Sequence, residues 1–202
     1  MSGILADVTT ERWMERARNL ARSVGNLAIE SKSIEVSTPE DLVVRDVLPY
    51  QDLDSGSANA WSGTQQWLQD LATNGSADDY NETYTLDSSG NLEDKVVGFY
   101  GISFLHSDIQ THQVRFKGGK NGTQGVRREF NVEAAETDEE GRALFLTDAI
   151  FGAKEDGTIE QYVGSNTDGN RVVYHGYVAE PVGETIAEES HPSLNNSPSV
   201  RR

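Results

Sequence analysis

The sequence of 202 residues contains no cysteine. Disulfides, thiolate catalysis and cysteine-bound zinc are therefore excluded. No run of 18 apolar residues occurs, so no segment reads as a membrane-spanning helix. The four histidines lie in no metal-binding spacing such as H-E-x-x-H, and neither a G-x-S-x-G motif nor a P-loop motif is present. The sequence thus offers no recognisable catalytic constellation, and we expect a protein that is not an enzyme and has no catalytic, cofactor or metal site.

Lysine is scarce as well. Five lysines and twelve arginines face 33 Asp and Glu residues, which leaves a net charge of −16. Such a chain repels itself at ordinary salt, whereas roughly 1 M salt shortens the Debye length to about 3 Å. Strongly hydrated carboxylates also keep a protein soluble where water is scarce. The composition therefore indicates a protein built for molar salt, from a haloarchaeon or a virus of such a host.

The charge also limits the partners. Phosphates would be repelled, so nucleic acid is not expected as a main partner. Acidic clusters such as Asp138-Glu139-Glu140 would attract loosely bound salt cations without forming a dedicated site. We expect no other cofactor.

The first segment is predicted to be an α-helix that begins at Thr9 or Thr10 and runs to Ala28. Apolar residues recur there at spacings of four and three, which is typical of a helix with one apolar stripe. The stripe consists of Trp13, Ala17, Leu20, Val24 and Leu27. Between positions 9 and 28, four arginines against two glutamates leave a local charge of +2 in an otherwise acidic protein.

Two interpretations of this helix remain open. It can pack on its own domain, or it can be an arm that docks on a neighbouring subunit, a shell or a membrane surface. The second interpretation makes an interface of the apolar stripe and the nearby arginines. The interface residues would be Trp13, Ala17, Leu20, Val24, Leu27, Arg12, Arg16 and Arg22.

The rest of the chain is predicted to be mostly β. Alternating or doubly apolar segments follow one another at a spacing of roughly ten residues with no helices between them, which favours an antiparallel sandwich, jelly roll or barrel. We favour an antiparallel β-sandwich built as a single jelly roll. The domain plan is a helical arm at 1–32, a β-sandwich at 33–183 with its strand-dense part at 95–183, and a polar C-terminal tail at 184–202.

Individual strands and turns can also be placed. Val96 to Leu105 is apolar on both faces, as a central strand would be, and Asp156-Gly157 and Asp168-Gly169 are typical of hairpin turns. The other expected strands cover 83–86, 112–117, 126–134, 143–151, 159–163 and 171–180.

Three stretches carry a family resemblance. Val96–Gly101, Val114–Gly119 and Gly176–Gly183 resemble β-rich structural proteins of haloarchaeal viruses. They are similar in style to single jelly-roll capsid proteins of icosahedral viruses with an internal membrane, and to capsid-decorating proteins of tailed viruses. The resemblance implies a β-sandwich in the virion that assembles with copies of itself and other virion proteins, without catalysis. An internal membrane is a further partner that it allows.

Two other functions stay open. Trp61, Trp67, Tyr80 and Tyr84 could form an aromatic platform of a carbohydrate- or receptor-binding β-sandwich. His106 and His112 are the only candidate ligands for a cupin-like enzyme, since cupins are jelly rolls. His106, Ser107 and Asp108 cannot form a triad as neighbours, because consecutive side chains point apart.

The charge predicts a salt-dependent stability. Between about 0.1 M and about 3 M KCl or NaCl, the melting temperature should rise steadily, because screening relieves the repulsion among carboxylates. Thermal melting followed by circular dichroism measures this. A flat or falling curve would contradict the halophile interpretation.

Overall fold

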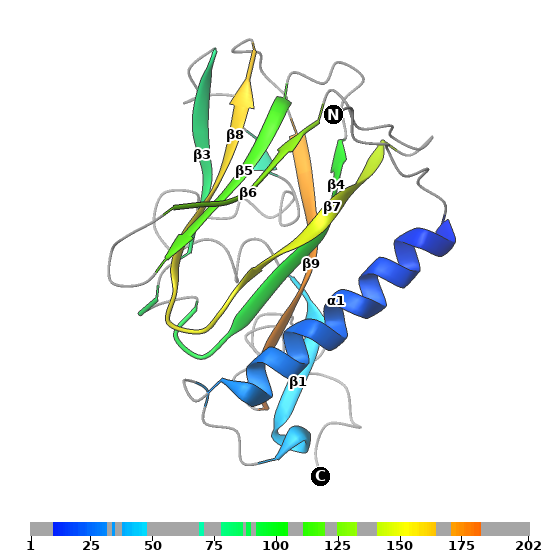
Figure 1. The fold of residues 1–202 in the computed structure, drawn as a ribbon, viewed down its shortest axis with the longest axis vertical. Coiled ribbons are helices and arrows are strands. Elements are labelled where there is room, and N and C mark those ends of the chain that lie inside the picture. The colour runs from blue at the N-terminus through cyan, green and yellow to red at the C-terminus, as the bar shows by residue number, and fades with distance from the viewer. Residues whose placement is uncertain are drawn as a thin grey trace, which may run out of the picture.

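The computed structural model describes residues 10–31, 34, 38–47, 69–70, 78–86, 88–89, 92–104, 111–119, 125–132, 141–164 and 171–182. Within these residues one long helix accompanies a β-rich body (Figure 1). The helix is α1, Thr10–Glu30, and a single 3-10 turn follows at Pro39–Asp41. The strands are β1 Leu42–Asp46, β2 Gln69–Asp70, β3 Asp79–Leu86, β4 Val96–Phe104, β5 Thr111–Gly119, β6 Gly125–Asn131, β7 Arg142–Phe151, β8 Asp156–Val163 and β9 Arg171–Pro181.

The strands form two antiparallel sheets. Sheet A has the order β1-β9-β4-β7, with the two-residue β2 also on β9, and sheet B has the order β3-β8-β5-β6. With β2 set aside, the first of eight strands pairs with the last, the second with the seventh, the third with the sixth and the fourth with the fifth. This nesting is what a long hairpin gives when it is rolled up, and it is the order of a jelly roll. The sequence prediction of an antiparallel β-sandwich with an N-terminal helix is confirmed.

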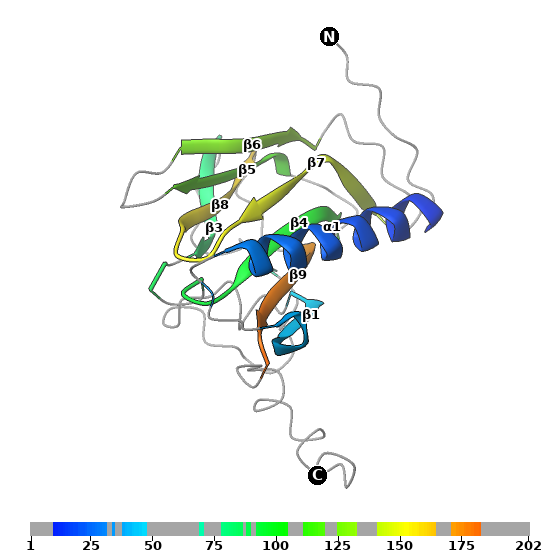
Figure 2. The same ribbon diagram turned by 60° about the horizontal axis from the view of Figure 1, so that its bottom comes forward.

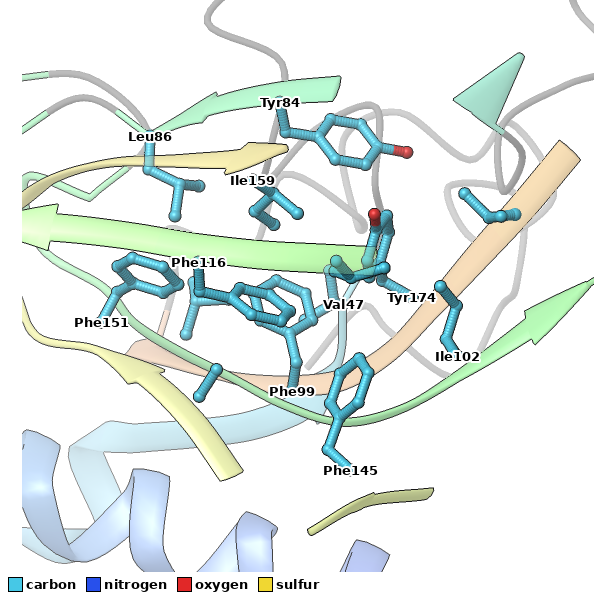
Figure 3. Close-up of a cluster of buried hydrophobic side chains, with 14 of the residues drawn as sticks. Val47, Tyr84, Leu86, Phe99, Ile102, Phe116, Phe145, Phe151, Ile159 and Tyr174 are labelled. Atoms are coloured by element: carbon cyan, nitrogen blue, oxygen red, sulfur yellow. The ribbon is translucent and has the colours of Figure 1, made fainter. Parts of the chain in front are cut away.

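The described residues form three layers with two apolar cores between them. The larger core lies between the sheets, where rings from both sheets meet, among them Phe99, Phe116 and Phe151 (Figure 3). The smaller core lies between α1 and the outer face of sheet A (Figure 2). Sheet A is therefore buried on both faces, which explains why β4 is apolar at nearly every position. A bulge between Phe99 and Gly101 shifts the alternation of β4, so that Ile102 returns to the larger core.

Most of the predicted helix stripe is confirmed, with one correction. Trp13, Ala17, Leu20 and Val24 are buried against sheet A, but Leu27 is 38% exposed and Ala28 is fully buried instead. Each residue turns a helix by about 100°, so Leu27 and Ala28 lie on opposite sides of Val24 around the helix axis. Sheet A lies on the side of Ala28, where Gly25 faces the Val44 side chain of β1. Among the described helices none is long and apolar enough to cross a membrane.

Two glycines of β4 form the seat of α1. A Cβ placed on Gly98 would lie 2.7 Å from Leu20 Cδ1 and 2.8 Å from Val24 Cγ2. A Cβ on Gly101 would lie 2.9 Å from the Trp13 ring. Real Cβ atoms do not approach so closely, so the helix can pack at this depth only over glycine.

The predicted turn at Asp156-Gly157 is wrong. These residues begin β8, and the chain reverses earlier, at Ala153 and Lys154, where Lys154 has a φ of 61° and donates its backbone N–H to Leu92 O. Gly157 serves packing, since a Cβ there would lie 2.6 Å from the Phe151 ring. Asp168-Gly169 lies outside the described residues.

The glycine seat yields a stability prediction. Gly98→Ala should lower the free energy of unfolding by about 1–3 kcal/mol, because the new methyl group pushes against Leu20 and Val24. Gly125→Ala is the matched control, since a Cβ there meets nothing within 4 Å. We expect that control to stay within about 0.5 kcal/mol of the unchanged protein in urea unfolding. Equal effects of the two substitutions would contradict the seat.

Candidate functional site

The outer face of sheet B is the candidate site. Helix α1 covers the outer face of sheet A, and no described helix lies over sheet B (Figures 1 and 2). The strand registers arrange the outward side chains in three rows across β3, β8, β5 and β6. The rows are Thr85, Thr158, Lys117 and Val126; then Glu82, Glu160, Arg115 and Glu129; then Tyr80, Tyr162, Gln113 and Asn131.

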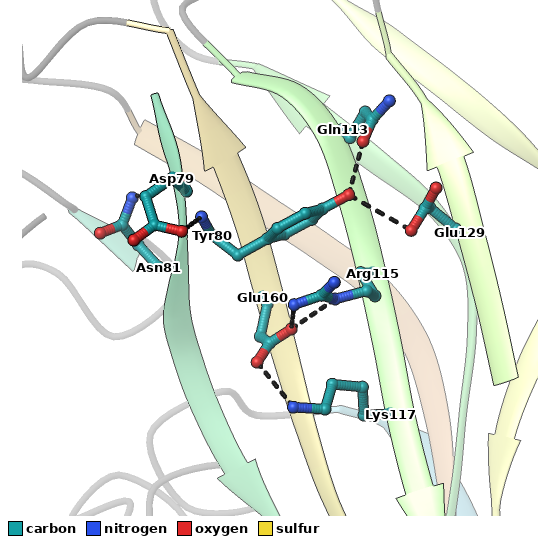
Figure 4. Close-up of polar contacts among 8 residues, drawn as sticks. All are labelled: Asp79, Tyr80, Asn81, Gln113, Arg115, Lys117, Glu129 and Glu160. Carbon is teal, nitrogen blue, oxygen red and sulfur yellow. Dashed lines mark hydrogen bonds and ion pairs between the residues drawn. The ribbon is translucent and has the colours of Figure 1, made fainter. Parts of the chain in front are cut away.

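Glu160 is the centre of the middle row (Figure 4). Its carboxylate accepts from Arg115, with Nε at 2.6 Å and Nη2 at 2.5 Å, and from Lys117 Nζ at 3.1 Å. The Glu160 side chain is only 11% exposed although it points away from the core. Because two cations hold it in a partly dry environment, its position is more tightly fixed than that of an ordinary surface carboxylate.

Tyr80 lies across the sheet beside this pair. The Arg115 guanidinium carbon is 3.5 Å from the centre of the Tyr80 ring, and Tyr162 meets the ring edge-on at 5.3 Å. The Tyr80 hydroxyl is a donor to Gln113 Oε1 at 2.5 Å and Glu129 Oε2 at 3.2 Å (Figure 4). Burial, and then the charge of Glu129, raise the pKa of Tyr80 above its ordinary value. The tyrosine therefore stays protonated and links three strands.

The predicted aromatic platform is not formed by Tyr80 and Tyr84. Tyr84 is 7% exposed and packs in the larger core against Tyr174. A bulge between Glu82 and Tyr84 is the reason, because the extra residue turns Tyr84 to the inner face while Tyr80 stays on the outer one. Trp61 and Trp67 lie outside the described residues.

The histidines lie apart. His112, in β5, has its ring 6.2 Å from that of Tyr162, whereas His175, in β9, lies under α1 with its Nε2 2.7 Å from Ser103 Oγ. Burial and the charge of Arg142 lower the pKa of His175 to about 4. In the described part of the chain no three His, Asp or Glu side chains are grouped so that they could hold a metal ion. His106, Ser107, Asp108 and His191 lie outside it.

The residues of the interface hypothesis divide into two sets. The buried apolar residues contact the chain's own sheet, which is the first interpretation of the helix. They are Trp13, Ala17, Leu20 and Val24. Arg16 also faces inward: its Nη2 pairs with Asp148 Oδ1 at 2.7 Å and donates to Phe145 O at 3.0 Å. Arg12, Arg22 and Leu27 remain exposed. A role of the helix between subunits stays a prediction, and these three residues are the ones that a neighbour could reach.

One buried ion cluster escaped the sequence analysis. Glu180 is fully buried near the end of β9 and accepts from Arg45 Nε at 2.8 Å and Nη2 at 2.9 Å, with Lys95 Nζ at 3.2 Å. It joins β1 to β9 across 135 positions of sequence. A glutamate inside the apolar run at 177–181 was the available signal. Its burial makes it part of the fold and leaves it no access to a ligand.

Comparisons with known proteins add little. No protein-family model matches the chain, and no curated protein matches its sequence. Two crystal structures of a pentameric capsid protein isolated from metagenomic phage sequences align with it, at 9% and 10% identity and TM-scores of 0.24 and 0.22. The alignments cover 90% of this chain in both cases, and 85% and 80% of those chains. Scores this low do not establish a shared fold.

The middle row of the site predicts a difference between two glutamates. Glu160→Gln should lower the free energy of unfolding by about 1–3 kcal/mol, because Arg115 and Lys117 then face each other without a carboxylate between them. Glu82→Gln, an exposed position in the same row, should change it by less than about 0.5 kcal/mol. Chemical unfolding of both variants tests this. The ordering would be refuted by a Glu82 variant as unstable as the Glu160 variant.

Proposed function

We propose that this chain is an oligomeric structural protein of a virion that works by assembly rather than catalysis. Its strand order is that of jelly rolls, an architecture found in viral capsids, lectins and cupins. A fold alone does not choose among these uses. The choice rests on the surfaces and the interior of this particular sandwich.

The outer face of sheet B is the observation that carries the proposal. It presents Tyr80, Arg115 and Glu160 already locked to one another, so a partner that binds there freezes few side-chain rotations. Tyrosine and arginine are also the residues that dominate binding energy at protein–protein interfaces. A face of fixed polar and aromatic groups suits contact with another protein surface.

The same geometry argues against the two alternatives. Sugar rings stack on exposed aromatic faces, but the Tyr80 ring is covered by Arg115 and met edge-on by Tyr162. A cupin-like site needs histidine and carboxylate ligands that converge between the sheets. In the described part of the chain that space is filled mainly by apolar side chains, such as the rings of Phe99 and Phe116, and its buried polar residues include Gln161 and Thr111.

The finer assignment follows from composition. A net charge of −16 with five lysines supports a virus of a haloarchaeal host, in which the chain would be a capsid-shell or capsid-decorating component. Its partners would be copies of itself and other virion proteins, and an internal membrane where the virus has one. The acidic side chains would hold loosely bound salt cations.

Two exposed valines provide the test. Val126 lies on the outer face of sheet B and Val182 lies beyond the end of β9, with 55% and 56% exposure. Light scattering after size-exclusion chromatography in about 3 M salt should show an oligomer. Val126→Glu should weaken its association by about tenfold or more, because a charged side chain would replace an apolar one in the contact, whereas Val182→Glu should leave it unchanged.

The outcomes are distinct. A monomer at every protein and salt concentration would overturn the proposed function. An oligomer that both variants leave intact would keep assembly but move the contact away from the outer face of sheet B.

A further inference from the structure

His175 is a titratable side chain in the seat of α1. It projects from β9 on the helix side of sheet A, and its ring meets that of Trp13 edge-on at 4.9 Å. Its Nε2 shares a hydrogen bond of 2.7 Å with Ser103 Oγ on β4. The Trp13 ring in turn sits against Gly101, so Trp13 and His175 occupy the same closely packed spot. A change in the charge of His175 therefore alters its contact with the helix that covers it.

The charges around His175 disfavour a second proton on its ring. Arg142 of β7 lies beside it, with its guanidinium 5.1 Å from the Trp13 ring. Tyr100 of β4 faces the histidine with its ring at 6.2 Å. The carboxylate of Asp46, in β1, contributes to raising the pKa of Tyr100 and of Tyr177, so it lies near this cluster. Protonation would thus place a cation near Arg142 in a largely dry contact.

We propose that His175 makes the docking of α1 acid-sensitive: a proton on its ring loosens the helix from sheet A before the sandwich opens. The sandwich core lies on the other face of sheet A and contains neither His175 nor any residue of α1. The acid response depends only on contacts within one chain, so it holds for a monomer and for an oligomer.

The direction follows from proton linkage. With α1 docked, burial and then Arg142 lower the pKa of His175 to about 4 from the ordinary value of 6.5. When the helix detaches, the ring returns to water and takes up a proton more readily. The docked state is therefore most stable above about pH 6.5. As the pH falls towards about 4, the equilibrium constant for docking decreases by roughly a hundredfold.

Asp148 opposes this response. It is half-buried in β7 beside Arg16 of α1, and burial raises its pKa above the ordinary value despite the arginine. Acid therefore protonates Asp148 more readily in the docked state, which favours docking. The two groups act in opposite directions, and the proposal requires the contribution of His175 to prevail.

Hydrogen exchange of the full-length protein tests the proposal. At about pH 7 the amides of α1 should open together with those of β5 and β8. At about pH 4, after correction for intrinsic exchange rates, the amides of α1 should exchange faster than those of β5 and β8, by up to about a hundredfold. Simultaneous opening at both pH values would overturn the proposal.

Two histidine variants make the test specific. His175→Gln keeps a group that can hydrogen bond to Ser103 but removes the titration, so the early opening of α1 in acid should disappear. His112→Gln, on β5 in the other sheet, should respond to acid like the unchanged protein. An unaltered acid response in the His175 variant would overturn the proposal.

Should that variant fail to fold, an NMR titration of His175 in the unchanged protein decides. Its ring signals should titrate near pH 4, together with the loss of α1 protection. A midpoint near 6.5 with the helix still docked would contradict the proposal.

Discussion

Sheet A is buried on both faces, and the rest of the structure depends on that constraint. Its inner face closes the sandwich, so its outer face needs a cover of its own, and α1 is that cover. Double burial explains the apolar run of β4, the glycines at 98 and 101 where the helix sits deepest, and the low pKa of His175 beneath Trp13. The apolar stripe of α1 is therefore used within the chain, and a neighbour can reach only the exposed side of the helix.

Sheet B has one face buried in the core and one face turned outward, and the outward face carries the side chains that can contact a partner. Glu160 holds Arg115 and Lys117, and Arg115 covers Tyr80, so the row is ordered before anything binds. If the chain assembles as proposed, the attraction between subunits would come from such fixed geometry rather than from net charge, because like-charged surfaces repel until salt screens them. The proposed assembly role and the proposed need for salt thus depend on one another.

The sequence predicted the parts of the fold that follow from periodicity. The stripe of α1, the doubly apolar β4 and the regular strand spacing led to an antiparallel sandwich with an N-terminal helix, but they left open whether that helix packs on its own sheet. It could not show bulges, because one extra residue leaves no mark in composition. The bulges before Tyr84 and Gly101 decide which side chains face outward. Nor could it show pairs such as Arg45–Glu180, which only the rolled topology brings together.

The most direct test of the central claim compares one residue from each core. Leu20 and Ile159 are both fully buried, the first under α1 and the second between the sheets. At neutral pH, Leu20→Ala and Ile159→Ala should each lower the free energy of unfolding by about 2–5 kcal/mol, in one transition seen alike by far- and near-ultraviolet circular dichroism. A Leu20 variant as stable as the unchanged protein would contradict the account, because the free energy of unfolding would then not depend on the cover of sheet A.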